Sequence, residues 1–133
     1  MKPLILLVSC LFLLCLNTSC EKAGQIHLIS AHTWVVTDVS NPSNFTRVGD
    51  ELSFLDNRLF FNNSNGFETD GEWDFIVSGT RAGLFTSYNI NEIAVTSGFS
   101  SYSFSIVNLT AKELEIRDIS GLGALNIRLK AKE

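Results

Sequence analysis

Cysteine and histidine are scarce in this chain. Its three cysteines, Cys10, Cys15 and Cys20, all precede residue 21, so the chain beyond them has no thiol pair for a disulfide. The two histidines, His27 and His32, lie five residues apart with no cysteine partner and do not match zinc-ligand spacing. We therefore expect a domain without disulfides, metal or cofactor.

Basic residues are also few. The chain has 10 Lys and Arg against 14 Asp and Glu, a net charge of −4, and no cluster of basic side chains. Neutralising nucleic-acid phosphates needs such clusters, so nucleic acid is excluded as a partner. The sequence also lacks a Gly-x-Ser-x-Gly elbow and any nucleophile–base pair. We expect no catalytic residues and no enzyme activity.

Long hydrophobic runs are missing as well. The longest apolar run, residues 4–16, carries no charge and is shorter than the about 20 residues that a membrane-spanning helix needs. Lys2 precedes this run, and the small residues Thr18 and Ser19 follow it. A charged start, an apolar stretch and small residues before the cleavage site are typical of a secretory signal peptide. We assign residues 1–19 to this signal.

The signal ends in `LNTSC`, residues 16–20, which resembles the lipobox of bacterial lipoproteins, in the relaxed form of Bacteroidota lipoproteins. The resemblance implies cleavage before Cys20 and a diacylglyceryl group on its thiol, which anchors the chain in the membrane of the cell envelope. Glu21 in place of an aspartate favours the outer membrane, again by resemblance. The alternative is ordinary secretion with cleavage nearby, which leaves Cys20 as a free thiol or removes it.

Residues 20–26 then form a lipidated tether, and residues 27–133 form one domain. In this domain, period-two apolar runs alternate with turn clusters such as `NPSN` and `NNSNG`. Eight strands are predicted, at 33–39, 51–55, 58–62, 71–77, 84–90, 102–109, 113–119 and 125–131. Residues 92–97 either extend the fifth or form a ninth. The glycine-containing segments `SGTRAG` and `SGLG` are predicted to be hairpin turns, because no helix follows them to bind phosphate.

The strands alternate cleanly between apolar and polar residues. In `YSFSIV`, Tyr102, Phe104 and Ile106 face one way and serines the other, so each strand buries one face. Short connections favour antiparallel pairing, because a parallel crossover needs a dozen or more residues. One-sided strands must close into a barrel or pair as a sandwich. The first strand alternates less well, since Trp34 and Val36 share a face with Asp38.

Residues 28–132 resemble the bacterial lipocalin-like lipoproteins. The resemblance rests on `HTW`, `LSFLDNRLFF`, `GEW`, `FSIVNLTAKELEI` and `NIRLK`, with His32 where that family has glycine. It implies an all-β, antiparallel, up-and-down eight-stranded barrel with one end closed near Trp34. Eight strands enclose an interior that is either filled by side chains or holds one small ligand.

Two interpretations of the aromatic residues follow. In the first, they line a cavity for a small apolar ligand; in the second, they fill the core. The candidate ligand-binding residues are Phe54, Phe61, Trp73, Phe75, Tyr88, Tyr102 and Phe104. Trp34 is expected to close one end.

Glu68, Asp70, Glu72 and Asp74 have strand periodicity, which predicts a solvated outer face rather than a calcium site, because an extended strand cannot wrap an ion. We expect Arg58 or Arg81 to offset their charge.

The leading functional hypothesis is a lipid-anchored barrel that binds a small apolar molecule. The alternative is a filled barrel whose rim loops contact an envelope protein or a glycan. Phe45 and Phe99 lie on such loops, where they either mark a contact site or fold back over the barrel mouth.

Overall fold

The structure, a computed structural model, describes residues 24–40, 45–76, 78–82, 85–89, 91–120 and 125–133. For residues 78–82 and 85–89 only the backbone is described. Its strands, in chain order, are β1 (Thr33–Val39), β2 (Glu51–Phe54), β3 (Leu59–Ser64), β4 (Phe67–Phe75), β5 (Ser78–Ala82), β6 (Phe85–Asn89), β7 (Glu92–Ser97), β8 (Ser100–Leu109), β9 (Glu113–Asp118) and β10 (Asn126–Ala131). Signal residues 1–19 and Cys20 lie outside the described residues.

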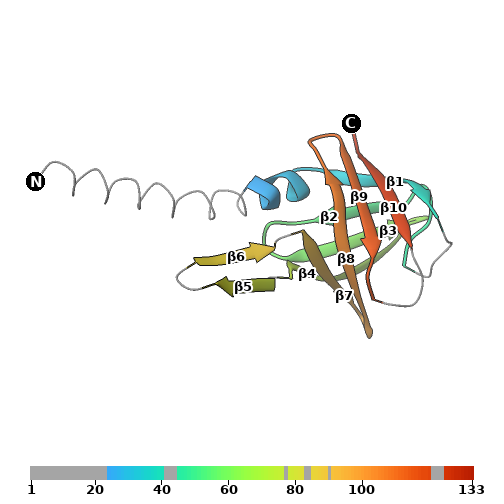
Figure 1. The fold of residues 1–133 in the computed structure, drawn as a ribbon. Helices are drawn as coiled ribbons and strands as arrows, with labels where there is room; N and C mark the ends of the chain where they lie inside the picture. Colours follow the sequence, from blue (N-terminus) through green and yellow to red (C-terminus); the bar gives the residue numbers. More distant parts are fainter. Residues whose placement is uncertain (1–23, 41–44, 77, 83–84, 90, 121–124) are drawn as a thin grey trace, which may run out of the picture.

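Eight strands close into an antiparallel barrel in the order β1-β10-β9-β8-β7-β4-β3-β2 (Figure 1). The predicted all-β, up-and-down, eight-stranded fold is confirmed. One strand assignment was wrong. Residues 85–89 do not join the barrel but pair with 78–82 in a separate hairpin, and β7 takes the place next to β4. The segment `SGTRAG`, predicted as a turn, supplies all of β5, because residues 78–82 pair with residues 85–89.

Two bulges correct the inside–outside alternation of the long strands. The register of β1 against β10 shifts between Val36 and Asp38, and that of β8 against β9 shifts between Ile106 and Asn108. One extra residue in each strand reverses which parity faces inward. Val39 and Leu109 thereby pack against the core, which explains why the pattern of the first strand looked irregular.

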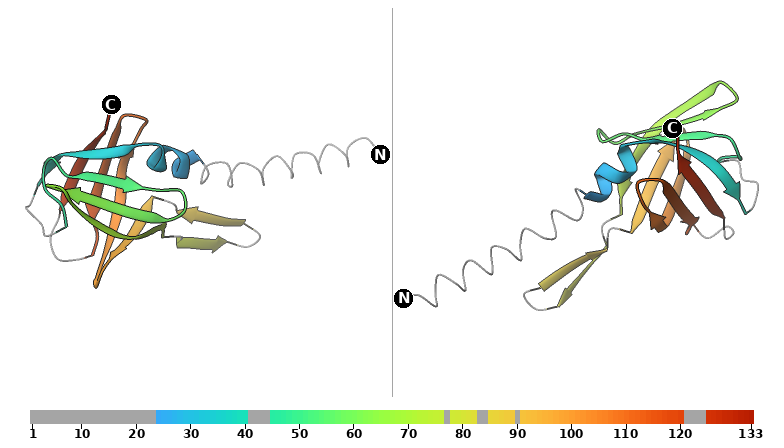
Figure 2. Two further views of the ribbon diagram at one scale, coloured as in Figure 1. Left: turned by 180° about the vertical axis from the view of Figure 1, so that it is seen from behind. Right: turned by 90° about the horizontal axis from the view of Figure 1, so that it is seen from above.

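Gly71 lies where β4, which up to this residue pairs only with β3, begins to pair with β7 as well. A Cβ atom at this position would lie 2.1 Å from the carbonyl oxygen of Thr96 on β7, so only glycine allows the two strands to approach this closely. Beyond it, residues 67–70 pair only with β3. The β3–β4 hairpin therefore extends past the end of β7, as Figure 2 shows.

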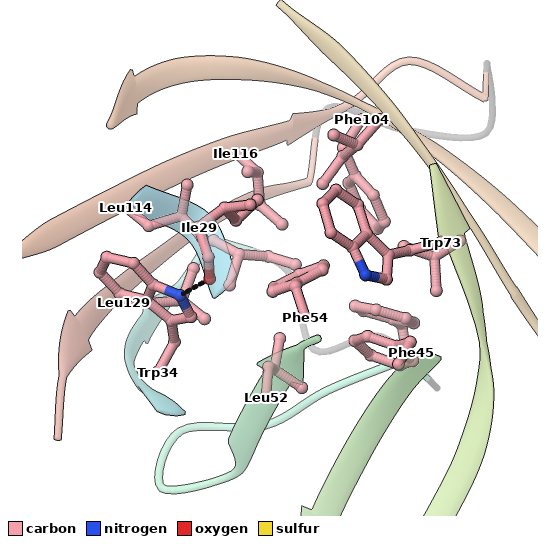
Figure 3. Close-up of a cluster of buried hydrophobic side chains, with 14 of the residues drawn as sticks. Ile29, Trp34, Phe45, Leu52, Phe54, Trp73, Phe104, Leu114, Ile116 and Leu129 are labelled. Carbon is pink, nitrogen blue, oxygen red and sulfur yellow. Dashed lines mark hydrogen bonds between the residues drawn. The ribbon is translucent and has the colours of Figure 1, made fainter. Parts of the chain in front are cut away.

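Residues 24–30 are helical and pack against the end of the barrel where β1 begins. The buried indole of Trp34 donates a hydrogen bond from Nε1 to the carbonyl oxygen of Ile29, at 2.8 Å (Figure 3). Ile29 is itself fully buried, and Ile26 packs beside it. Residues 24–26, assigned above to the tether, thus belong to the folded domain. In the described part of the chain, no helix is long and apolar enough to cross a membrane.

The barrel consequently has two distinct ends. The proximal end carries helical residues 24–30, the β2–β3 and β8–β9 turns and the β5–β6 hairpin. The distal end carries residues 40 and 45–50, the β3–β4 turn at 65–66, the β7–β8 turn at 98–99 and residues 119, 120 and 125. Helical residues 24–30 lead into β1 at the proximal end, so the distal end is the end of the barrel away from this helix (Figure 1).

Candidate functional site

Most of the predicted interior aromatics lie inside the barrel. Phe54, Trp73, Phe75 and Phe104 are buried in one cluster, and Tyr102 is half-buried against it. Phe54 and Phe75 each meet Trp73 edge-on, and Tyr102 stacks on Phe104 with 6.2 Å between the ring centroids. The Phe54 and Trp73 centroids, for example, are 5.6 Å apart at 83°. Figure 3 shows Phe54, Trp73 and Phe104 pointing toward one another from different strands.

Two of the predicted residues occupy other places. On β3 the inward ring is that of Phe60, which is 1% exposed, whereas Phe61 alternates to the outer face. Both are phenylalanines, so composition did not distinguish them, and the register opposite Phe54 decides which one points inward. Tyr88 lies on β6, outside the barrel, because residues 78–89 form their own hairpin.

Phe45 packs into the distal mouth of the barrel. Its ring centroid lies 4.5 Å from that of Tyr102 and 5.1 Å from that of Phe104, and it stacks on Phe60 at 5.8 Å. This loop residue therefore belongs to the core, as one of the two alternatives for it predicted. With Ile29 in the core at the proximal end, the described interior side chains pack against one another from end to end.

A compact loop holds Phe45 in place. The carboxylate of Asp50 accepts hydrogen bonds from the Thr46 hydroxyl at 3.1 Å and from the Arg47 backbone N–H at 2.9 Å. Gly49 adopts a positive φ of 94°, and its N–H donates to the carbonyl oxygen of Val36. The loop is thus tied both to itself and to β1, which fixes where Phe45 enters the barrel.

Asn62 on β3 is the polar residue that joins this loop to the barrel wall. It is 7% exposed, and its side-chain Nδ2 donates to the carbonyl oxygen of Phe45 at 2.8 Å. Its Oδ1 is buried and has no hydrogen-bond partner. Buried side-chain oxygens are usually paired, so this unpaired acceptor calls for an explanation. The prediction that Phe61 faces inward put its neighbour Asn62 on the outer face of the strand. Asn62 was therefore missed from the sequence as an inward-facing residue.

The acidic row of β4 lies on the outer surface, as predicted. Glu68, Asp70, Glu72 and Asp74 are all exposed. Arg58 contributes the expected compensation: its Nε lies 3.5 Å from the Asp74 carboxylate, and its guanidinium lies 5.3 Å from the centre of the Trp73 ring. Arg81 falls on the segment whose side chains are not described. Among the described residues, no three acidic, histidine or cysteine side chains gather as metal ligands would.

Large exposed apolar side chains concentrate at the distal end. Three such residues are on its loops and turns and a fourth is the first residue of β4, whereas Leu59 and Val107 lie on strands nearer the proximal end. Phe67 is 81% exposed and Phe99 is completely exposed, so Phe99 does not fold back over the barrel mouth as Phe45 does. We call this set the distal apolar rim; its members are Val48, Phe67, Phe99 and Ile119.

Comparisons with family models, curated proteins and solved structures found no match to this chain. The eight-stranded barrel itself rests on the strand pairing alone, and the resemblance to lipocalin-like lipoproteins remains a proposal.

Proposed function

We propose that this protein is a lipid-anchored barrel of the lipocalin-like lipoprotein type, which acts through its distal rim by contacting another component of the cell envelope. It is not an enzyme in this proposal. Cys20 carries the diacylglyceryl anchor, and two acyl chains suffice for stable attachment to a membrane. Residues 21–23 are the short link between the anchor and the helical residues 24–30.

The observation that carries the proposal is the placement of the exposed apolar residues. Phe67, the first residue of β4, and Phe99, on the β7–β8 turn, are exposed at the distal end of the barrel, opposite helical residues 24–30. Exposed apolar side chains gathered at one place mark contact sites on soluble domains. A barrel held to the membrane at its proximal end presents this rim away from the lipid surface, where a partner can reach it.

The packing of the interior favours this function over carriage of a small apolar ligand. Phe45 occupies the distal mouth, Ile29 lies in the core at the proximal end, and the rings of Phe54, Trp73 and Phe104 fill the space between them. A carrier needs an apolar cavity of about 300 Å³ or more. Protein interiors are closely packed and contain few voids of that size.

Photo-crosslinking in the intact envelope tests the proposal. A diazirine amino acid replaces Phe67 or Phe99, and the same probe at Leu59 or Val107 is the matched control on the barrel wall. We expect adducts, seen as slower gel mobility, from the two rim positions and none from the two wall positions. Equal labelling at all four positions, or none at the rim, refutes contact through the rim.

A further inference from the structure

Two grooves meet at the distal mouth around Asn62. One has a volume of about 370 Å³ and runs along the Phe45–Asp50 loop to Phe67. The other has a volume of about 120 Å³ and lies between β3 and the β7–β8 turn. Both are lined by Phe45, Asn62 and Thr69, so they lie on either side of the same side chains.

The unpaired oxygen of Asn62 indicates what these grooves recognise. Its Nδ2 is committed to the carbonyl oxygen of Phe45, so the amide cannot turn over without losing that bond. Oδ1 therefore presents a fixed acceptor that lacks a donor. Leaving a buried acceptor unpaired destabilises the protein, and a ligand hydroxyl or amide N–H would recover that cost. The oxygen is covered, so a donor reaches it after a rotamer change of a lining side chain, which is common on binding.

The rest of the lining combines hydroxyl groups with aromatic faces. Thr69, Ser64, Ser97 and Ser100 contribute hydroxyls, and the exposed ring of Phe67 stands at the edge of the larger groove. The Thr69 and Ser97 hydroxyls donate to the carbonyl oxygens of Asn62 and Asp70 and can still accept a hydrogen bond from a ligand. A flat ring offers an apolar surface. A ligand that matches both has many hydroxyls on one side and C–H groups on another, as the sugar ring of a saccharide does.

The charges near the grooves select against anions. Asp50 lines the larger groove with its carboxylate already hydrogen-bonded, and Glu68 and Asp70 flank it on the outer face of β4. Arg47 is the cationic residue of that lining. Acidic saccharides would meet more negative than positive charge here.

We infer that the paired grooves around Asn62 form a binding site for a neutral saccharide, with Asn62 Oδ1 accepting a sugar hydroxyl or acetamido N–H and Phe67 packing against the ring. This inference rests on the proposed function, because it names the partner of the distal rim as a glycan.

Calorimetric titration of the full lipidated chain in detergent tests the inference. The neutral probes are maltotriose and tri-N-acetylchitotriose, and trigalacturonate is the charged comparison, each at up to about 10 mM to reach millimolar affinities. We expect at least one neutral probe to bind, to shift the Asn62 side-chain amide signals in nitrogen–proton spectra, and to outcompete trigalacturonate. Binding of neither neutral probe, or preference for the acid, overturns the inference.

Variants then locate the site. Asn62→Leu keeps the side-chain volume but removes the acceptor, and we expect about tenfold weaker binding, the value of one hydrogen bond. Phe67→Ala should also weaken binding about tenfold, and Phe67 is so exposed that the fold cannot depend on it. Asn108→Leu, at an exposed position on β8, is the matched control and should bind normally. Unchanged binding by Phe67→Ala places the sugar elsewhere and overturns the inference even if Asn62→Leu fails to fold.

The two proposals fail separately. Rim crosslinks without saccharide binding leave contact through the distal rim standing and overturn only the glycan. Absence of both rim crosslinks and saccharide binding overturns the two together.

Discussion

Replacing Trp34 by phenylalanine tests how the N-terminal helix is joined to the barrel. The indole is fully buried, and its Nε1 hydrogen bond to the Ile29 carbonyl connects β1 with helical residues 24–30. Phenylalanine keeps an aromatic ring but removes the donor and part of the volume. The unpaired carbonyl costs about 1–3 kcal/mol. The small void adds about 1 kcal/mol.

We therefore expect Trp34→Phe to lower the free energy of unfolding by about 3 kcal/mol, a large part of the 5–15 kcal/mol typical of a domain. For a domain of this length the melting temperature should fall by about 10 °C, measured by circular dichroism. Amide exchange at Ala31, whose N–H bonds the His27 carbonyl, should accelerate more than exchange in the barrel core.

His32→Ala is the control for this prediction. The His32 ring meets Trp34 edge-on at 5.7 Å from a half-buried position, so its removal should cost no more than about 1 kcal/mol. The reasoning is refuted if Trp34→Phe is as stable as the parent protein, or if the two variants lose equal stability.

Three further predictions concern the barrel and its anchor. Gly71→Ala should destabilise the protein by about 1–3 kcal/mol in urea titrations, because the new Cβ meets the Thr96 carbonyl oxygen. Gly24→Ala is the control: open space surrounds this position, and the change should stabilise the helix by about 0.5–1 kcal/mol. A fluorescent fatty-acid probe should show no saturable binding, because aromatic rings fill the described interior; binding that unlabelled palmitate displaces would contradict this. Cys20→Ala should abolish labelling by radioactive palmitate and release the protein from membranes, and a variant that still takes up label would disprove the anchor.

The sequence alone determined an all-β, antiparallel architecture, because period-two alternation and short turns give strands that each bury one face. The alternation allowed a barrel or a sandwich, and the resemblance to a family favoured the barrel. It also placed Phe54, Trp73, Phe75 and Phe104 in the interior and the acidic row of β4 outside. These are local properties: each depends on the parity of a residue within one strand. The lipid anchor at Cys20 and the resemblance to a family are likewise readable from the chain, and they remain predictions.

The tertiary structure decided what parity could not. Bulges between Val36 and Asp38 and between Ile106 and Asn108 reverse the inward parity within a strand, and only the pairing partner shows where the extra residue falls. Pairing likewise chose Phe60 over Phe61 and moved Tyr88 out of the barrel.

Asn62 shows the same limit at the candidate site. The Phe45 loop, distant in sequence, folds into the barrel mouth beside Asn62 and takes its Nδ2 hydrogen bond, which leaves Oδ1 buried and unpaired. Contacts between segments far apart in the chain depend on how the barrel closes, and no short stretch of sequence encodes them.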